Sequence, residues 1–161
     1  MTVLLDNTVL SNFSRVRCPD LVRLAFVEEV GTTTLAFEEM RAGIVSGRLA
    51  ECDWTWLTRF HVNPAEQQHF DTLVVRLGRG EASCLAVAFC RGYRMATDDR
   101  DARRVARQLS IPLSGTIGIL AALAKQERIS HGEGNRLLRA MVAAGYRAPV
   151  QTLDEVIDSP N

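Results

Sequence analysis

The chain has 161 residues with 19 basic and 19 acidic side chains, so its formal net charge at pH 7 is zero. Hydrophobic residues make up 47% and charged residues 24%, which is typical of a folded globular domain and excludes a disordered chain, a collagen-like chain and a strongly cationic nucleic-acid coat. A nucleic-acid enzyme is not excluded, because it needs positive charge in one place only. At this length we expect one domain over residues 1–161, in which residues 146–161 form a C-terminal tail or short helix.

The chain opens with an apolar run, residues 2–5, that ends at Asp6, which is typical of a buried parallel strand. Asn7 and Thr8 provide capping groups for a helix, because apolar residues recur at helical spacing over residues 9–16. The next predicted elements are a short helix, a weak strand, a helix, a strand with aromatic residues and an amphipathic helix, over residues 19–25, 27–30, 34–49, 54–62 and 64–77.

Gly78 is predicted to end the amphipathic helix. Gly80 opens the sequence EASCLAVAFCRG, which is apolar nearly all round and therefore predicts a buried central helix. The remaining predictions are a strand, a helix, a strand, two helices and a last helical turn, over residues 93–97, 101–109, 111–113, 115–126, 131–144 and 153–157. Strands that alternate with helices predict an α/β fold, with a central, mainly parallel sheet and helices on both faces.

The cysteines form no C-x-x-C pair and have no nearby histidine at ligand spacing, so we expect free thiols and no zinc site: Cys18, Cys52, Cys84 and Cys90. The apolar part of the N-terminus is too short for a signal peptide. No apolar run approaches the ~20 residues that span a bilayer. We therefore expect a cytoplasmic protein with no membrane contact.

Four acidic residues are candidates for one site. Asp6 and Asp99 each follow a predicted strand, at the edge where open parallel sheets place their active sites. Glu39 and Glu81 lie in predicted helices. Each acid alone is explained by helix capping, by the helix dipole or by solvent exposure. Clustered carboxylates would repel one another unless a hard cation such as Mg²⁺ or Mn²⁺ neutralised them, and such a metal can activate water and shield a phosphate.

The order of these acids resembles the PIN-domain family, which comprises metal-dependent ribonucleases and includes the toxins of bacterial and archaeal toxin–antitoxin pairs. The resembling segments are LLDNTVLSNF, EMRAGI, GRGEASCLAVA and ATDDRDARRVA. The family pattern selects Glu39 over Glu38 and Asp99 over Asp98, and Asn7 stands where the family usually has threonine. The later SGTIGILAALAKQERIS resembles a PIN subgroup with a G-T-x-G-[IV]-L helix after the fourth acidic motif.

The resemblance implies a PIN-like three-layer α/β/α sandwich and an endoribonuclease that hydrolyses RNA phosphodiester bonds with Mg²⁺ or Mn²⁺. It assigns catalysis and metal binding to Asp6, Glu39, Glu81 and Asp99. It also implies a role as the toxin of a type II pair, with a small antitoxin protein as partner, and a homodimer.

The alternative is a catalytically inactive PIN-fold module that binds nucleic acid or protein, against which the complete acidic set argues. A phosphatase of the haloacid-dehalogenase type fits less well, because Asp6-Asn7-Thr8 lacks the second acid that it needs after the first strand. A receiver domain also needs an acidic pair there.

Four arginines recur at positions i, i+3, i+4 and i+7 and so share one face of a predicted helix beside Asp99: Arg100, Arg103, Arg104 and Arg107. The planar guanidinium group suits phosphate oxygens. The arginines are therefore either a nucleic-acid-binding surface or an ordinary solvated helix face.

Several polar residues near the acids remain open. Asp101 either contacts the metal ligands without binding the metal itself or faces solvent. Asn7 and Thr97 are further candidates for contacts to the ligands. Thr116 is predicted to cap its helix, and His131 to lie at a helix start rather than act as a general base.

Two apolar segments bear on partners. The aromatic side chains of Trp54, Trp56 and Phe60 are predicted to be core rather than a platform for stacked bases. Residues 21–26 either join a groove for a dimer or antitoxin partner or pack internally.

Overall fold

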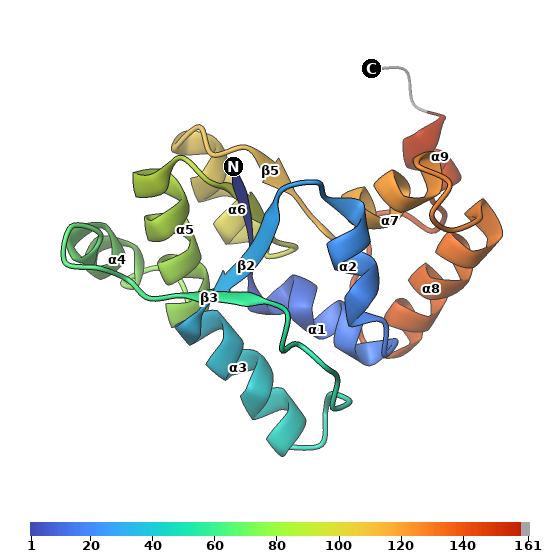
Figure 1. Ribbon diagram of the computed structural model, residues 1–161, viewed down its shortest axis with the longest axis horizontal. Helices are drawn as coiled ribbons and strands as arrows, with labels where there is room; N and C mark the ends of the chain where they lie inside the picture. Colours follow the sequence, from blue (N-terminus) through green and yellow to red (C-terminus); the bar gives the residue numbers. More distant parts are fainter. Residues whose placement is uncertain (159–161) are drawn as a thin grey trace.

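A computed structural model describes residues 1–158 of the chain (Figure 1). Its centre is a five-stranded sheet in the order β3-β2-β1-β4-β5, in which every strand pair is parallel. The strands are β1 Thr2–Leu5, β2 Glu29–Thr33, β3 Thr58–Phe60, β4 Arg94–Ala96 and β5 Leu113–Ser114. The prediction of a central parallel sheet is confirmed.

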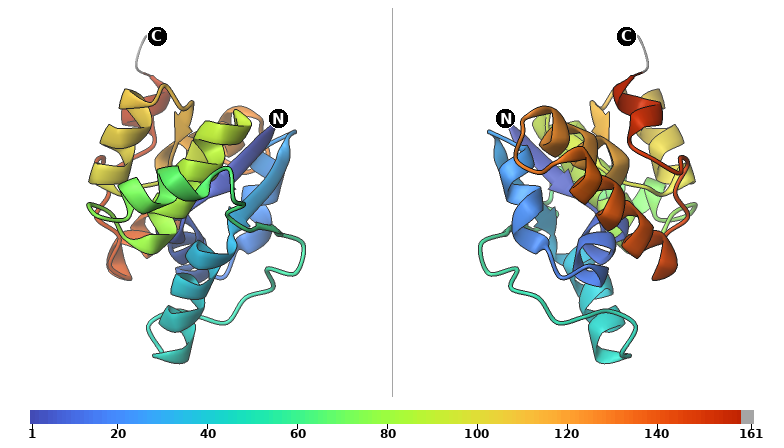
Figure 2. Two further views of the ribbon diagram at one scale, coloured as in Figure 1. Left: turned by 90° about the vertical axis from the view of Figure 1, so that its left-hand side faces the viewer. Right: turned by 90° about the vertical axis from the view of Figure 1, so that its right-hand side faces the viewer.

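Helices cover both faces of this sheet. They are α1 Asn7–Arg15, α2 Pro19–Ala25, α3 Thr34–Val45, α4 Gln67–Leu73, α5 Arg79–Arg91, α6 Arg100–Gln108, α7 Thr116–Lys125, α8 His131–Ala143 and α9 Asp154–Ile157. In Figure 2 the left view has α5 in front and the opposite, right view has α8 in front. The three-layer α/β/α sandwich is therefore confirmed.

The central strand β1 shows why two helical layers are needed. Val3 and Leu5 belong to the core cluster that includes residues of α1, α7 and α8, whereas Leu4 belongs to the cluster with residues of α5 and α6. All three side chains are fully buried. Successive residues of a strand face opposite sides, so a strand that is apolar throughout requires cover on both faces.

The strand order positions the candidate site. β1 pairs with both β2 and β4, and Leu5 is opposite Thr32 on one side and Ala96 on the other. Because all strands are parallel, the residues that follow them meet at the same edge. The N-termini of α1, α3, α6 and α7 therefore converge at the carboxyl edge of the sheet, directly after β1, β2, β4 and β5.

The prediction of a strand over residues 54–62 is wrong in its first half. β3 is confined to Thr58–Phe60, and a turn precedes it, in which the Leu57 N–H donates to the Trp54 carbonyl at 3.1 Å. Trp54 is buried, and its indole N–H donates to the Ser14 hydroxyl at 3.1 Å. This long-range contact to α1 outweighs the local β propensity.

The predicted helix over residues 64–77 is also too long. Asn63 and Glu66 form a reciprocal pair before α4, in which the N–H of each donates to the side chain of the other. α4 ends at Leu73, and Gly78 does not stop it: Gly78 has extended backbone and caps the start of α5. Three other elements differ from their predicted bounds by a few residues. α3 ends at Val45 instead of residue 49, β2 begins at residue 29 instead of 27, and β5 covers residues 113–114 instead of 111–113.

The C-terminal region packs back onto the domain. Tyr146 and Leu153 are buried, and α9 makes the predicted last helical turn. The prediction for residues 159–161 lies outside the described residues. Within residues 1–158, the helices are too short or too polar to traverse a bilayer.

Candidate functional site

Asp6 is the most constrained carboxylate at the carboxyl edge of the sheet. It is fully buried and caps α1: its Oδ1 accepts hydrogen bonds from the N–H groups of Thr8 and Val9, at 2.9 and 3.2 Å, and from the Thr8 hydroxyl at 2.5 Å. Its Oδ2 accepts from the Thr97 hydroxyl. Burial raises the pKa of Asp6 to about 7, against these hydrogen bonds, and the charge of Asp98 raises it further.

Thr97 joins the two strand-end acids. Besides its bond to Asp6, the buried Thr97 hydroxyl accepts the N–H of Asp99 at 3.1 Å. Asp99 caps α6, because its Oδ1 accepts the N–H of Ala102 at 2.7 Å. The other carboxylate oxygen of Asp99 accepts no hydrogen bond from residues 1–158. Asp99 therefore keeps one oxygen available for a ligand.

Glu39 and Glu81 meet where α3 packs against the start of α5. The Gly80 N–H donates to Glu39 Oε1 at 2.9 Å. A Cβ on Gly80 would clash with the Glu39 carboxylate and lie 3.1 Å from the Cα of Ala36, so glycine allows this close approach. Burial raises the pKa of Glu81, and the charges of Glu39 and Asp99 raise it further.

Cys84 lies close to the strand-end acid Asp6 and the helix acid Glu81. It is fully buried on α5, and its thiol lies 3.7 Å from the Leu5 carbonyl. Burial raises the pKa of Cys84 to about 12, and the charges of both Asp6 and Glu81 contribute. Cys84 therefore lies near both Asp6 and Glu81, and Glu39 and Asp99 are near Glu81.

The four acids have the donor chemistry of a divalent metal site but not its geometry. Carboxylate oxygens are the ligands that Mg²⁺ and Mn²⁺ prefer, and a cation would offset the repulsion that raises the pKa of Glu81. Within residues 1–158, however, no three or more His, Cys, Asp or Glu side chains are arranged as a set of metal ligands. The donor chemistry fits a divalent cation, and the side chains would have to move closer together to hold one.

Asp98, which the family pattern passes over, accepts as many hydrogen bonds as Asp6 does, from residues of three other segments. Its carboxylate accepts from the N–H and hydroxyl of Thr116 at 2.9 and 2.5 Å, from Asn12 Nδ2 at 3.1 Å and from the Tyr146 hydroxyl at 3.4 Å. Its own N–H donates to the Thr8 hydroxyl at 2.9 Å. Asp98 thus holds α1, α7 and the segment after α8 together.

Sequence reasoning missed Asn12 and Tyr146. Asn12 is buried, and a signal for it existed, because it follows Thr8 by one helical turn and so shares its face. Tyr146 had no local signal. Its place beside Asp98 depends on the packing of α8 against α1 and α7.

The other candidate residues have separate roles. Asn7 accepts the Ser11 hydroxyl at 2.9 Å, within α1. Asp101 is exposed and pairs with Arg104 at 3.0 Å, which is the solvent-facing alternative. Thr116 bonds to Asp98 at the start of α7, and the exposed His131 lies at the start of α8, 3.9 Å from Asp154.

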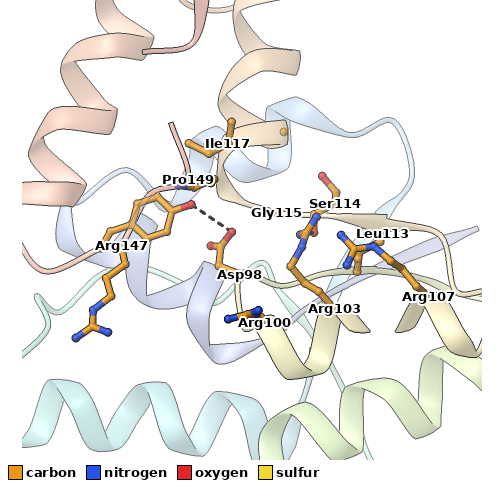
Figure 3. Close-up of a pocket in the computed structure, with 12 residues that line it drawn as sticks. Asp98, Arg100, Arg103, Arg107, Leu113, Ser114, Gly115, Ile117, Arg147 and Pro149 are labelled. Atoms are coloured by element: carbon orange, nitrogen blue, oxygen red, sulfur yellow. Dashed lines mark hydrogen bonds between the residues drawn. The ribbon is translucent and has the colours of Figure 1, made fainter. Parts of the chain in front are cut away.

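The arginines of α6 divide into two groups. Ala102 and Ala106 bury one side of α6, which turns the arginines outward. Arg100, Arg103 and Arg107 line a cavity of about 730 Å³ that also includes Asp98 (Figure 3). Arg104 does not line this cavity and pairs with Asp101 instead. The four arginines therefore do not form one uniform surface: three line the cavity, and Arg104 forms an ion pair outside it.

Arg103 also has a structural role. Its Nη1 donates to the carbonyls of Thr97 and Ser114, at 2.7 and 3.0 Å. These carbonyls follow β4 and end β5, so Arg103 links two strand ends beside the acids.

The two apolar segments pack mostly inward. Trp54 belongs to the core and Phe60 stacks edge-on against Tyr93 at 5.7 Å, which confirms the core interpretation of these two side chains. In residues 21–26, Val22 and Ala25 are buried while Leu24 is exposed.

The comparisons with known proteins address the family directly. The family model DUF3368, described as a PIN domain, matches residues 2–161. Among solved structures, a PilT N-terminus domain protein from the hyperthermophilic archaeon Sulfolobus solfataricus P2 is 17% identical, with a TM-score of 0.49, over 81% of this chain and 98% of that chain. A search of curated proteins found no match. Since the family model covers nearly the whole chain, the chain belongs to the PIN-domain family.

Proposed function

We propose that this protein is an endoribonuclease that hydrolyses RNA phosphodiester bonds with Mg²⁺ or Mn²⁺. PIN domains are generally nucleases that use divalent metals, which supports the class of reaction. The observation that carries the proposal is geometric: the buried Thr97 hydroxyl joins the Asp6 carboxylate to the Asp99 N–H, and the Gly80 N–H holds the Glu39 carboxylate at the start of the helix that carries Glu81. Burial raises the pKa of Glu81, the charges of Glu39 and Asp99 raise it further, and a bound cation would offset that repulsion.

In this proposal Asp6, Glu39, Glu81 and Asp99 would hold the metal. The bound cation would supply an activated water and would neutralise charge on the phosphate. Thr97 orients two of the ligands, since its hydroxyl contacts both the Asp6 carboxylate and the Asp99 N–H. Glu39 is oriented by the Gly80 N–H. These hydrogen bonds restrict the orientation of the carboxylates, which would close around the cation when it binds.

The cationic side chains would position the RNA strand. Arg100, Arg103 and Arg107 lie on the helix that Asp99 caps, so phosphates bound to them would be adjacent to the acids. Arginine provides charge and directed N–H donors for phosphate oxygens. Arg104, which the sequence pattern includes in this set, would contribute less because Asp101 neutralises it.

The proposal includes the role of toxin in a type II toxin–antitoxin pair, with a small antitoxin protein as partner and a homodimer as the working form. Exposed apolar side chains at the end of α2, Leu24 and Val27, are compatible with such contacts. If the role is correct, induced wild-type protein arrests growth of a bacterial host and an Asp99→Asn variant does not.

One observation favours a second function, a PIN-fold module that binds nucleic acid or protein without catalysis. Both oxygens of Asp6 are occupied by hydrogen bonds, and no described set of three acids has metal-ligand geometry. Such a module would bind RNA and leave it intact.

The deciding experiment incubates labelled RNA with the purified protein and Mn²⁺, and follows thermal melting in parallel. The endoribonuclease cleaves RNA only with metal, and Asp6→Asn and Asp99→Asn abolish cleavage while the variants stay folded. Full activity of either variant contradicts the site. Stabilisation by Mn²⁺ without cleavage supports the binding module.

A further inference from the structure

The cavity beside Asp98 collects positive charge from two distant parts of the chain. Arg100, Arg103 and Arg107 enter it from α6, and Arg147 enters it from the segment that follows α8. Figure 3 shows Arg147 on the opposite side of Asp98 from Arg103 and Arg107. The cavity is therefore bounded by arginines on two sides.

These four arginines have no carboxylate partner within 4.0 Å among residues 1–158, unlike Arg104 on the same helix. Arg103 donates to two backbone carbonyls, which are neutral acceptors. Arg100, Arg107 and Arg147 are exposed. A concave surface with several unpaired guanidinium groups attracts anions, and most strongly those with phosphate oxygens.

Among residues 1–158, the cavity wall holds a single acid, Asp98, against four arginines, so its net charge is positive. The Asp98 carboxylate accepts four hydrogen bonds, two from Thr116 and one each from Asn12 and Tyr146. Burial and the charge of Asp98 raise the pKa of Tyr146, so its hydroxyl remains a donor to that carboxylate. The carboxylate is thus anchored to α7 and α1, and the four arginines outnumber it in the cavity wall.

The rest of the wall is apolar. Leu113, Ile117 and Pro149 line the same cavity. A volume of about 730 Å³ is well above that of an isolated phosphate and within the range of ~300–1,000 Å³ of small-molecule sites. Cationic groups at the rim with apolar side chains between them suit a phosphate that carries a flat, apolar base.

We propose that this cavity is a subsite for one nucleotide of a bound RNA strand, with its phosphate at Arg147 and the α6 arginines and its base against Ile117 and Pro149. The inference rests on the proposed ribonuclease function for the identity of the strand. It adds Arg147 as a residue that contacts substrate. The chemistry recognised is a nucleoside monophosphate, either free or within a strand.

The test measures binding by calorimetry in EDTA, so that it does not depend on a metal or on cleavage. The probes are adenosine, AMP and a single-stranded pentanucleotide. The variants are Arg147→Ala and, as a matched control on a residue outside the cavity, Arg104→Ala. Arg147 is exposed, so its replacement leaves the fold intact.

We expect AMP to bind more tightly than adenosine, and Arg147→Ala to weaken both AMP and the pentanucleotide about tenfold, as for loss of one charged hydrogen bond. Arg104→Ala should weaken them less than about twofold, because exposed, screened charges contribute little. AMP should also displace the pentanucleotide. Equal effects of the two variants, or no binding of AMP, overturn the inference.

Two further outcomes separate this inference from the ribonuclease proposal. If AMP binds and the pentanucleotide does not respond to Arg147→Ala, the cavity takes a free nucleotide and the strand subsite is wrong. If both ligands behave as expected and the protein cleaves no RNA with Mn²⁺, the subsite stands and the catalytic proposal fails.

Discussion

The hydroxyl of Thr97 donates a hydrogen bond to the carboxylate of Asp6, from the end of β4 to the end of β1. The same oxygen accepts the N–H of Asp99 at 3.1 Å. One buried hydroxyl therefore sets the relative position of two acids that are far apart in the chain and that are both proposed to bind metal.

Replacement of Thr97 by valine should disturb this link, because valine has a similar shape and no hydroxyl. We expect Thr97→Val to lower the free energy of unfolding by about 1–3 kcal/mol, as for a buried acceptor that loses its partner. RNA cleavage should fall as well. Urea unfolding and a cleavage assay measure the two effects. Thr97→Ser keeps the hydroxyl and serves as the control, and a Thr97→Val protein with the stability and cleavage of the wild type would contradict the role of this hydrogen bond.

The raised pKa of Asp6 predicts a pH dependence of stability in the metal-free protein. Its folded-state pKa of about 7 lies above the ordinary value of 3.8, so the folded protein binds the proton more tightly than the unfolded chain. This stabilisation is complete below about pH 4 and is lost as pH rises through 7, a difference of up to about 4 kcal/mol.

Asp6→Asn isolates this effect, since asparagine keeps the shape and does not ionise. In EDTA, we expect the variant to be more stable than wild type at pH 8 and similar at pH 4, measured as the difference between two urea unfolding series. Mn²⁺ should stabilise only the wild-type protein at pH 8. A constant difference across the pH range would argue against a buried, protonated Asp6.

Neighbouring glutamates on α3 provide a matched pair. Glu39 contacts α5 through Gly80, whereas Glu38 is exposed. Glu39→Gln should remove one of the charges that raise the pKa of Glu81 and should lower Mn²⁺ affinity and cleavage at least about 100-fold. Glu38→Gln has the same change in charge and should leave both unchanged. Similar Mn²⁺ titrations for the two variants would exclude Glu39 as a ligand.

Gly80 should tolerate no side chain. A Cβ there would clash with the Glu39 carboxylate, so Gly80→Ala should push α3 and α5 apart and cost about 1–3 kcal/mol of stability, with loss of cleavage. The control is Gly132→Ala in α8, where the nearest atom is the Ser130 Oγ at 3.9 Å. That substitution should stabilise the protein by about 0.4–1 kcal/mol, because alanine restricts the unfolded chain. Thermal melting compares the two.

The local pattern of the sequence was a good guide where burial is uniform. Residues 2–5 are apolar throughout and form β1, and the apolar run after Gly80 forms the buried helix α5. The local pattern failed where a contact between distant residues determines the secondary structure. Trp54 sits in a turn because Ser14 binds its indole, and Gly78 starts a helix instead of ending one.

The order of strands, acids and helices could be predicted from local patterns, because periodicity and capping depend on residues within a few positions of one another. The family resemblance then selected the four acids. Their arrangement depends on long-range contacts: the pairing of β1 with β4 places Thr97 beside Asp6, and Asp98 accepts hydrogen bonds from residues of three other segments.

The arginines of α6 make the same distinction. Helical spacing places four of them on one face, but it does not say what lies opposite. Arg104 forms an ion pair with Asp101, whereas the other three arginines of α6 line a cavity together with Arg147, which follows α8. The interaction between two charges depends on the distance between them in space. Which arginines are paired and which are not is therefore set by the packing of these segments and not by their spacing in the sequence.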